Sequence, residues 1–137
     1  MDLRLEKVSL ALGAWKLKDF SIKADSGSFA SIVGPSGCGK TTVLRIIAGL
    51  AKPDKGKVFF GKTDVTKVEP EKRNAGLVFQ HDALFSHLNV FENVAFGLIE
   101  HTDTSRGEMA KRVKECLALV GLKDIEEKKP AELSGGM

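Results

Sequence analysis

A glycine-rich stretch between an apolar segment and an amphipathic one constrains this chain more than any other feature. Residues 34–41 read Gly-Pro-Ser-Gly-Cys-Gly-Lys-Thr and match the pattern G-x-x-x-x-G-K-[ST]. The short apolar segment Phe29–Val33 before it predicts a buried strand. Lys40–Ala48 after it predicts a helix, with Val43, Leu44, Ile47 and Leu50 on one face. Strand, glycine-rich loop and helix in this order are the opening of an α/β unit.

The residue types of this loop suit a polyphosphate. Glycines let successive backbone N–H groups approach an anion closely, and the helix that follows adds the partial positive charge of its N-terminus. Lys40 supplies a point charge for the β- and γ-phosphates, Thr41 offers a hydroxyl to Mg²⁺, and Thr42 is a further donor. We therefore predict a nucleotide-phosphate site made of Gly34, Pro35, Ser36, Gly37, Cys38, Gly39, Lys40, Thr41 and Thr42.

The segments before the loop alternate apolar and polar residues. Leu3–Leu10 follows this alternation, and it returns from Trp15 to Ile22, which is the period of a half-buried strand. A turn at residues 25–28 separates them from the buried strand, so we predict an antiparallel β layer beside the α/β core. Two more strands are predicted at Lys57–Phe60 and Ala75–Phe79, with a polar stretch between them.

The second half of the chain has the signals of helices. Asn89 followed by Glu92, and Ser105 followed by Glu108, each predict a helix start of the capping-box kind. Gly121 predicts the end of the second helix. We predict that residues 1–85 form an α/β core with its antiparallel layer and that residues 86–137 form a helical subdomain.

Composition excludes several classes of protein. The 137 residues are 42% apolar and 28% charged, which is typical of a globular chain and not of a disordered one. A net charge of +3 is too small to indicate a nucleic-acid partner, so none is predicted. Cys38 and Cys116 are far apart in sequence, which favours reduced thiols in the cytosol over a disulfide scaffold.

Other motifs select among proteins with such a loop. The chain has no N-K-x-D and no D-x-x-G motif, which argues against a GTPase. The loop, Gln80 after a predicted strand, and Leu133-Ser134-Gly135-Gly136 together resemble the ATP-binding subunit of an ABC transporter. Residues 71–98 are similar to the importer ATPases of sugar, polyamine, iron(III), oxyanion and thiamine uptake. The resemblance implies an α/β P-loop NTPase fold with an antiparallel β edge layer and a helical insertion.

The resemblance also implies roles for individual residues. Gln80 corresponds to the glutamine that reaches Mg²⁺ and the attacking water, so the implied catalytic residues are Lys40 and Gln80, and the implied metal contacts are Thr41 and Gln80. Ser134, Gly135 and Gly136 correspond to the signature motif, which closes over the γ-phosphate of a second subunit in a head-to-tail dimer. The next position, usually Gln in the family, is Met137 here.

The adenine platform departs from the family pattern. Family members stack adenine on an aromatic residue, often Tyr, and this chain has no Tyr. The corresponding position is Leu12, and Trp15 lies slightly further along. An indole stacks well on a base, so Trp15 is the candidate platform; a tryptophan that merely packs is the alternative.

The family also implies partners and a location. ATP and Mg²⁺ are the implied ligands. Residues 85–98 correspond to the surface that faces membrane-spanning permease subunits, and we expect two of Phe91, Val94 and Phe96 to fill the core instead. The ATPase would be cytoplasmic and peripheral on the inner face of the membrane. His81, His87 and His101 lack a metal-ligand spacing.

One family motif is missing. After the signature motif the family has an apolar strand that ends in Asp-Glu, and these 137 residues contain no such run. We therefore expect an N-terminal part of a longer transport ATPase that binds nucleotide but is inactive alone. The unpaired strand edge predicts a swapped or non-native oligomer. The alternatives are a soluble non-transport ABC ATPase and a non-catalytic nucleotide-binding remnant.

Overall fold

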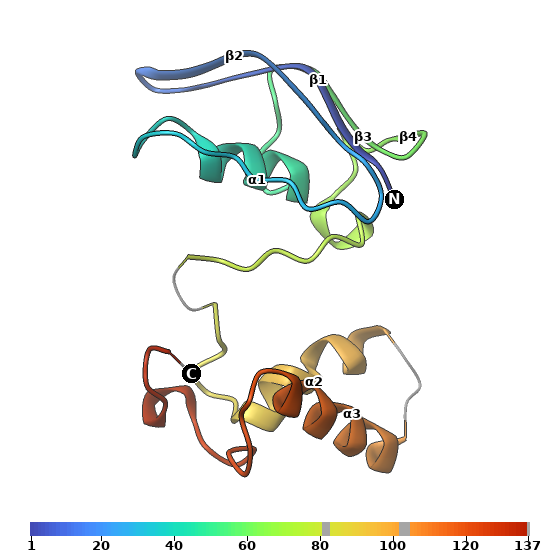
Figure 1. The fold of residues 1–137 in the computed structure, drawn as a ribbon, viewed down its shortest axis with the longest axis vertical. Coiled ribbons are helices and arrows are strands. Elements are labelled where there is room, and N and C mark those ends of the chain that lie inside the picture. The colour runs from blue at the N-terminus through green and yellow to red at the C-terminus, as the bar shows by residue number, and fades with distance from the viewer. Residues whose placement is uncertain (81–82, 102–104, 137) are drawn as a thin grey trace. The chain divides into compact units, whose positions relative to one another are not determined.

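The chain folds as two compact units, Met1–Val78 and Phe79–Met137. The structure, a computed structural model, describes residues 1–80, 83–101 and 105–136. The first unit holds the sheet and helix α1, and the second holds helices α2 and α3 (Figure 1). The division falls at residues 78 and 79, seven residues before the boundary expected from the sequence.

An antiparallel sheet organises the first unit. Its strands are β1 (Leu3–Leu12), β2 (Trp15–Ala24), β3 (Lys55–Phe60) and β4 (Thr63–Asp64), in the order β2-β1-β3-β4. β1 pairs antiparallel with both β2 and β3, which confirms the predicted antiparallel layer. The short strand β4 lies within the stretch that the sequence predicted as a polar connection.

Two bulges keep the apolar residues of this sheet on one face. Leu5 and Val8 are both buried although three positions separate them, where a regular strand would require two or four. Lys7 is the extra residue, with a left-handed φ of 47°, and Asp19 on β2 has a φ of 46°. Gly56 fits against the first bulge because a Cβ there would come within 2.4 Å of the Lys7 carbonyl oxygen. Each bulge adds one residue where the alternation of apolar and polar residues shifts by one position. The apolar side chains of β1 and β2 therefore stay on the same face of the sheet.

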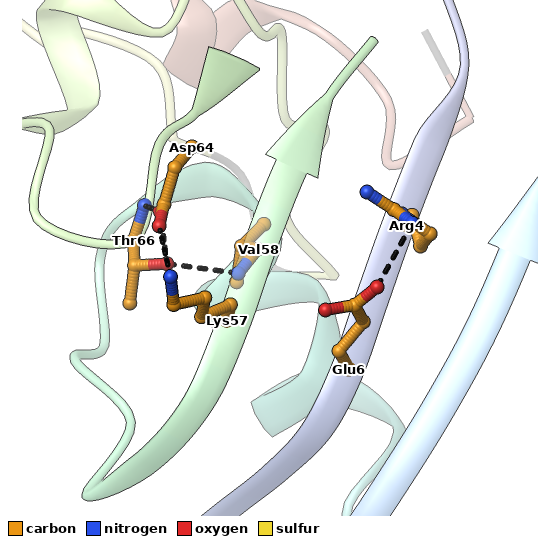
Figure 2. Close-up of polar contacts among 6 residues, drawn as sticks. All are labelled: Arg4, Glu6, Lys57, Val58, Asp64 and Thr66. Atoms are coloured by element: carbon orange, nitrogen blue, oxygen red, sulfur yellow. Dashed lines mark hydrogen bonds and ion pairs between the residues drawn. The ribbon is translucent and has the colours of Figure 1, made fainter. Parts of the chain in front are cut away.

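Thr66 closes the far end of the β3–β4 hairpin. Its hydroxyl accepts a hydrogen bond from Val58 N at 2.9 Å and donates one to Asp64 Oδ1 at 2.5 Å, while Lys57 Nζ lies 3.4 Å from Asp64 Oδ2 (Figure 2). These bonds lower the pKa of Asp64, chiefly through the Thr66 hydroxyl and then the Thr66 N–H. The Thr66 hydroxyl thus serves as the hydrogen-bond acceptor for the Val58 N–H beyond the end of the short strand β4.

Helix α1 (Lys40–Ala48) packs its apolar face against the sheet and confirms the predicted helix. Val43 and Ile46 are buried with the sheet residues in one core, and full burial of Ile46 stabilises the fold by about 1.5–3 kcal/mol. The predicted face is wrong in part: Leu44 and Leu50 are exposed. Ile46 lies in the core in place of Leu44, because Val43 and Ile46 are three positions apart and share the side of the helix that faces the sheet.

Two predicted strands are not strands in the structure. Phe29–Val33 and Ala75–Phe79 have no strand assignment, and the side chains of Phe29 and Val78 are each 96% exposed. A buried strand exists only when neighbouring strands pair with its backbone. Among the described residues, the four strands of the sheet pair only with one another, so apolar composition alone produced no strand here.

Helices α2 (Val90–His101) and α3 (Arg106–Leu119) form the second unit. Both predicted capping boxes begin helices: Glu92 N donates to Asn89 Oδ1 at 2.8 Å, and Glu108 N donates to Ser105 Oγ at 3.4 Å. The core of this unit consists of Val90, Ala95, Val113, Leu117 and Ile125.

The aromatic positions of α2 behave as expected from the sequence. Phe91 and Val94 pack against this core and Phe96 is exposed, which confirms that two of these three residues are internal. Short 3₁₀ turns at Pro70–Lys72 and Pro130–Glu132 complete the described elements. Within the described ranges, no helix has the length and apolar character needed to cross a membrane.

Candidate functional site

The glycine-rich loop presents open backbone N–H groups at the start of α1. Gly39 precedes the helix with a left-handed φ of 103°, and no side chain caps the N-terminus. The Val43 N–H bonds to the Gly39 carbonyl at 3.0 Å and closes the first turn. The first N–H groups of a helix have no partner within it. Together with the helix dipole they make a binding site for an anion.

Lys40 holds the two ends of the loop together. Its Nζ donates to the carbonyl oxygens of Gly34 and Pro35, each at 2.8 Å, and lies 3.8 Å from Cys38 Sγ. The ammonium group is therefore already inside the loop. A phosphate oxygen would replace neutral carbonyl acceptors with a charged one, which adds attraction between opposite charges to the hydrogen bonds of the ammonium group.

Trp15 forms the wall beside this loop. A cavity of about 290 Å³ lies there, lined by Leu12, Trp15, Gly37, Gly39, Lys40, Thr41 and Thr42. A Cβ on Gly39 would come within 2.1 Å of Trp15 Cζ2, so the indole lies directly against the residue that precedes the helix. The structure brings Trp15, which the sequence offered as a base platform, together with the phosphate loop. It combines an aromatic surface with open amides, as nucleotide sites do.

Arg73, which is not among the site residues predicted from the sequence, supports α1 from its other end. Its guanidinium donates to the carbonyl oxygens of Ile46 and Ile47, each at 2.9 Å, and to those of Val68 and Thr66 at 2.9 and 3.3 Å. Burial lowers the pKa of Arg73. The only sequence signal was its place between a polar stretch and an apolar segment, which does not distinguish it from a surface arginine.

The remaining predicted site residues lie in the second unit. Gln80 is exposed near its start, and Ser134, Gly135 and Gly136 are exposed after the Pro130–Glu132 turn. Leu133 packs against the core of the unit and fixes the start of this glycine segment.

The histidines form no metal site in the described part of the chain. His87 is exposed, and its ring lies 6.0 Å from that of Phe85 in an edge-on arrangement. His81, Met137 and the side chain of His101 lie outside the described residues. Among the residues that the structure describes, no three His, Cys, Asp or Glu side chains are grouped to hold a metal ion.

Two exposed aromatic rings pack together at α2: Phe85 lies before the helix and Phe96 lies within it. The rings of Phe85 and Phe96 lie 4.6 Å apart, and both side chains are 41% exposed. Asn93 fixes the Phe85 backbone: its Oδ1 accepts from Phe85 N at 2.9 Å, and its Nδ2 donates to Phe85 O at 3.2 Å. Leu84, the residue before Phe85, is also exposed.

Comparison with known proteins identifies the family. A family model described as ABC transporter matches residues 17–137. The spermidine/putrescine import ATP-binding protein PotA of Hahella chejuensis is 51% identical over 120 residues, which cover 88% of this chain and 33% of that protein. The sulfate/thiosulfate import ATP-binding protein CysA of Neisseria meningitidis is 48% identical over 140 residues, covering 99% of this chain and 39% of its own length.

A solved structure agrees with this assignment. The dimeric post-hydrolysis structure of the ATP-binding cassette MJ0796, bound to ADP and Pi, superposes with a TM-score of 0.86 at 33% identity and covers 97% of this chain and 63% of that one. The chain spans roughly two fifths or less of the length of these curated relatives. The family model covers most of the chain, and the chain therefore belongs to the ABC transporter ATP-binding family.

Proposed function

We propose that this chain is the nucleotide-binding part of an ABC transporter ATPase of the import type, which couples ATP binding and hydrolysis to solute uptake. Family membership implies nucleotide binding. The names of the relatives, import ATP-binding proteins for polyamines and for sulfate or thiosulfate, support the import direction. The activity is proposed for the whole protein, because these relatives are each more than twice as long as this chain.

The observation that carries this proposal is the convergence of three groups on one cavity. The residues at the uncapped start of α1, Lys40 among them, and Trp15 all line the same space. The amides and Lys40 suit the phosphates of a nucleotide, and the indole suits its base. Trp15 is therefore the proposed adenine platform, with Leu12 beside it in place of the usual aromatic residue.

The loop also fits a magnesium nucleotide. Thr41 is exposed at the first turn of α1 and lines the cavity, and Mg²⁺ is commonly held by few protein oxygens together with substrate phosphates. Thr41 would supply one such oxygen, and Gln80 is the proposed second. The ion would neutralise phosphate charge, while Lys40 and the loop amides of this chain orient the phosphates.

The second unit supplies the proposed protein contacts. Ser134, Gly135 and Gly136 are an exposed hydroxyl and glycine amides, which suit the γ-phosphate held by a second ATP-binding subunit, and the structural neighbour is a dimer. The Phe85–Phe96 pair is the proposed contact for permease subunits. Such contacts would place the protein at the cytoplasmic face of the membrane.

Co-purification tests the transport assignment. The whole protein that contains this chain, expressed with its permease subunits, should be recovered with them from detergent-solubilised membranes. Phe85→Ser with Phe96→Ser should reduce this recovery, because the change removes the exposed aromatic pair. Leu119→Ser, at an exposed position on α3, is the matched control. Recovery with nucleic acid and without membrane subunits would instead support the soluble, non-transport alternative.

A further inference from the structure

Arg73 is the one buried charged side chain in the described part of the chain, with 3% of its surface exposed. All four of its hydrogen-bond acceptors are main-chain carbonyls. Two of these carbonyls, those of Ile46 and Ile47, belong to the last turn of α1, and the others belong to the connection at residues 66–68. One guanidinium therefore joins the end of α1 to a separate segment.

The arrangement suits the chemistry of a helix end. The last carbonyls of a helix have no partner within it and carry partial negative charge, so a cation is favourable there. A planar guanidinium has donors in fixed directions and can bond several carbonyls at once. Gly49 makes room for it: a Cβ at this position would come within 2.6 Å of Arg73 Nε, and its φ of 86° also favours glycine.

The two ends of α1 act on different groups. Its N-terminus presents the phosphate-binding amides, and its C-terminus is held by Arg73. The helix has nine residues and is about 14 Å long, so a shift at one end reaches the other. Val43 and Ile46 hold its sheet-facing side by apolar contact, which has no direction of its own. The bonds from Arg73 are directional and fix the helix along its axis.

We propose that Arg73 is a positioning residue for the phosphate loop: it sets the axial position of α1 and so the aim of the amides that bind phosphate. The inference rests on the proposed nucleotide binding and adds a residue on the far side of the helix from the ligand. Binding of an anion by preorganised amides depends on their placement within a fraction of an ångström. Loss of the Arg73 bonds should therefore weaken phosphate binding in protein that remains folded.

Two probes separate the phosphate loop from the base platform. The first is a non-hydrolysable ATP analogue with Mg²⁺, and the second is inorganic tripolyphosphate with Mg²⁺, which has no base. Arg73→Met should lower the affinity for both probes by about tenfold, which is the scale expected when hydrogen bonds made by a charged group are lost. Arg73→Lys, which keeps the charge but not the planar fork, should weaken both by about threefold. Trp15→Ala should weaken the analogue alone.

Controls distinguish positioning from general destabilisation. Val58→Ala opens a cavity in the same core, where Val58 is fully buried, and should lower the melting temperature with phosphate binding within twofold of wild type. Arg45→Met removes an exposed cation from the same last turn of α1 and should also bind within twofold. Trp15 emission, from the single tryptophan of the chain, should shift in ligand-free Arg73→Met and not in Val58→Ala, because Trp15 touches Gly39.

The outcomes are distinct. A folded wild-type chain that binds neither probe refutes the proposed function. If the wild type binds both probes, and folded Arg73→Met binds them with an affinity within twofold of the wild-type value, the positioning role alone is overturned. If Arg73→Met does not fold, Arg73→Lys decides: weaker binding of both probes than Val58→Ala supports the role, and binding equal to Val58→Ala overturns it.

Discussion

The Trp15 ring lies against Gly39, so close that a Cβ on Gly39 would come within 2.1 Å of the indole. Trp15 is the first residue of β2 and Gly39 is the N-cap of α1, so this contact joins the antiparallel sheet to the phosphate loop. Glycine is required at position 39 both by this contact and by its φ of 103°. The base side and the phosphate side of the site thus meet at one glycine.

Trp15→Ala should weaken nucleotide binding by about 1–3 kcal/mol, the usual contribution of an aromatic ring that stacks on a base. Trp15→Phe should retain most of the affinity because it keeps a ring. Calorimetric titration with the ATP analogue measures the difference. Equal affinity in folded Trp15→Ala and wild type would show that Trp15 only packs.

Gly49→Ala should lower the free energy of unfolding by about 1–3 kcal/mol, since the residue has a left-handed φ and the new methyl group would meet Arg73. Urea denaturation measures the change. Gly97→Ala is the control, because Gly97 lies in the middle of α2 with open space at its Cβ and the substitution should stabilise by about 0.5–1 kcal/mol. An unchanged midpoint for Gly49→Ala would contradict the described packing of Arg73.

Asn93→Ala should free the segment that carries Phe85. The Asn93 amide makes hydrogen bonds to both backbone polar groups of Phe85 and to the carbonyls of Leu88 and Asn89. Their loss should destabilise the second unit by about 1–3 kcal/mol, and hydrogen exchange of the Phe85 N–H should become faster. Asn93→Asp keeps the acceptor and should show an intermediate effect. An unaltered exchange rate of the Phe85 N–H would contradict the role of Asn93 in holding this segment.

Thr66→Val should raise the pKa of Asp64 toward its ordinary value of 3.8, because Thr66 is the main cause of the lowered value. A carboxylate with a lowered pKa in the folded state contributes stability above about pH 3.8 and loses it as the pH falls through the folded-state pKa. The affected window is therefore below pH 3.8. Carboxyl NMR titration gives the pKa directly, and an identical value in both proteins would contradict the bond network of Figure 2.

The local signals in the sequence predicted the local structure well. The capping residues Asn89 and Ser105 begin the helices that they predicted, and the loop before Lys40 leads into α1. The alternation of β1 and β2 predicted an antiparallel pair. These features depend on residues near one another in the chain, which is why the pattern alone was sufficient.

Features that depend on distant partners were missed or mispredicted. Phe29–Val33 has the composition of a buried strand but no paired neighbour among the described strands, and Leu44 has helical spacing but faces away from the sheet. The role of Arg73 depends on carbonyls 26 and 27 positions away. No pattern in a single sequence encodes such a set of backbone acceptors.

Titration of the folded chain with Mg²⁺ and a non-hydrolysable ATP analogue, followed by the emission of Trp15, tests the central claim most directly. We expect saturable binding, with an affinity at least tenfold weaker in Lys40→Ala because a charged hydrogen-bond donor is lost. The matched change Lys114→Ala, at an exposed position on α3, should leave binding unaltered. A folded wild-type chain without saturable binding, or Lys40→Ala that binds equally well, would contradict the account.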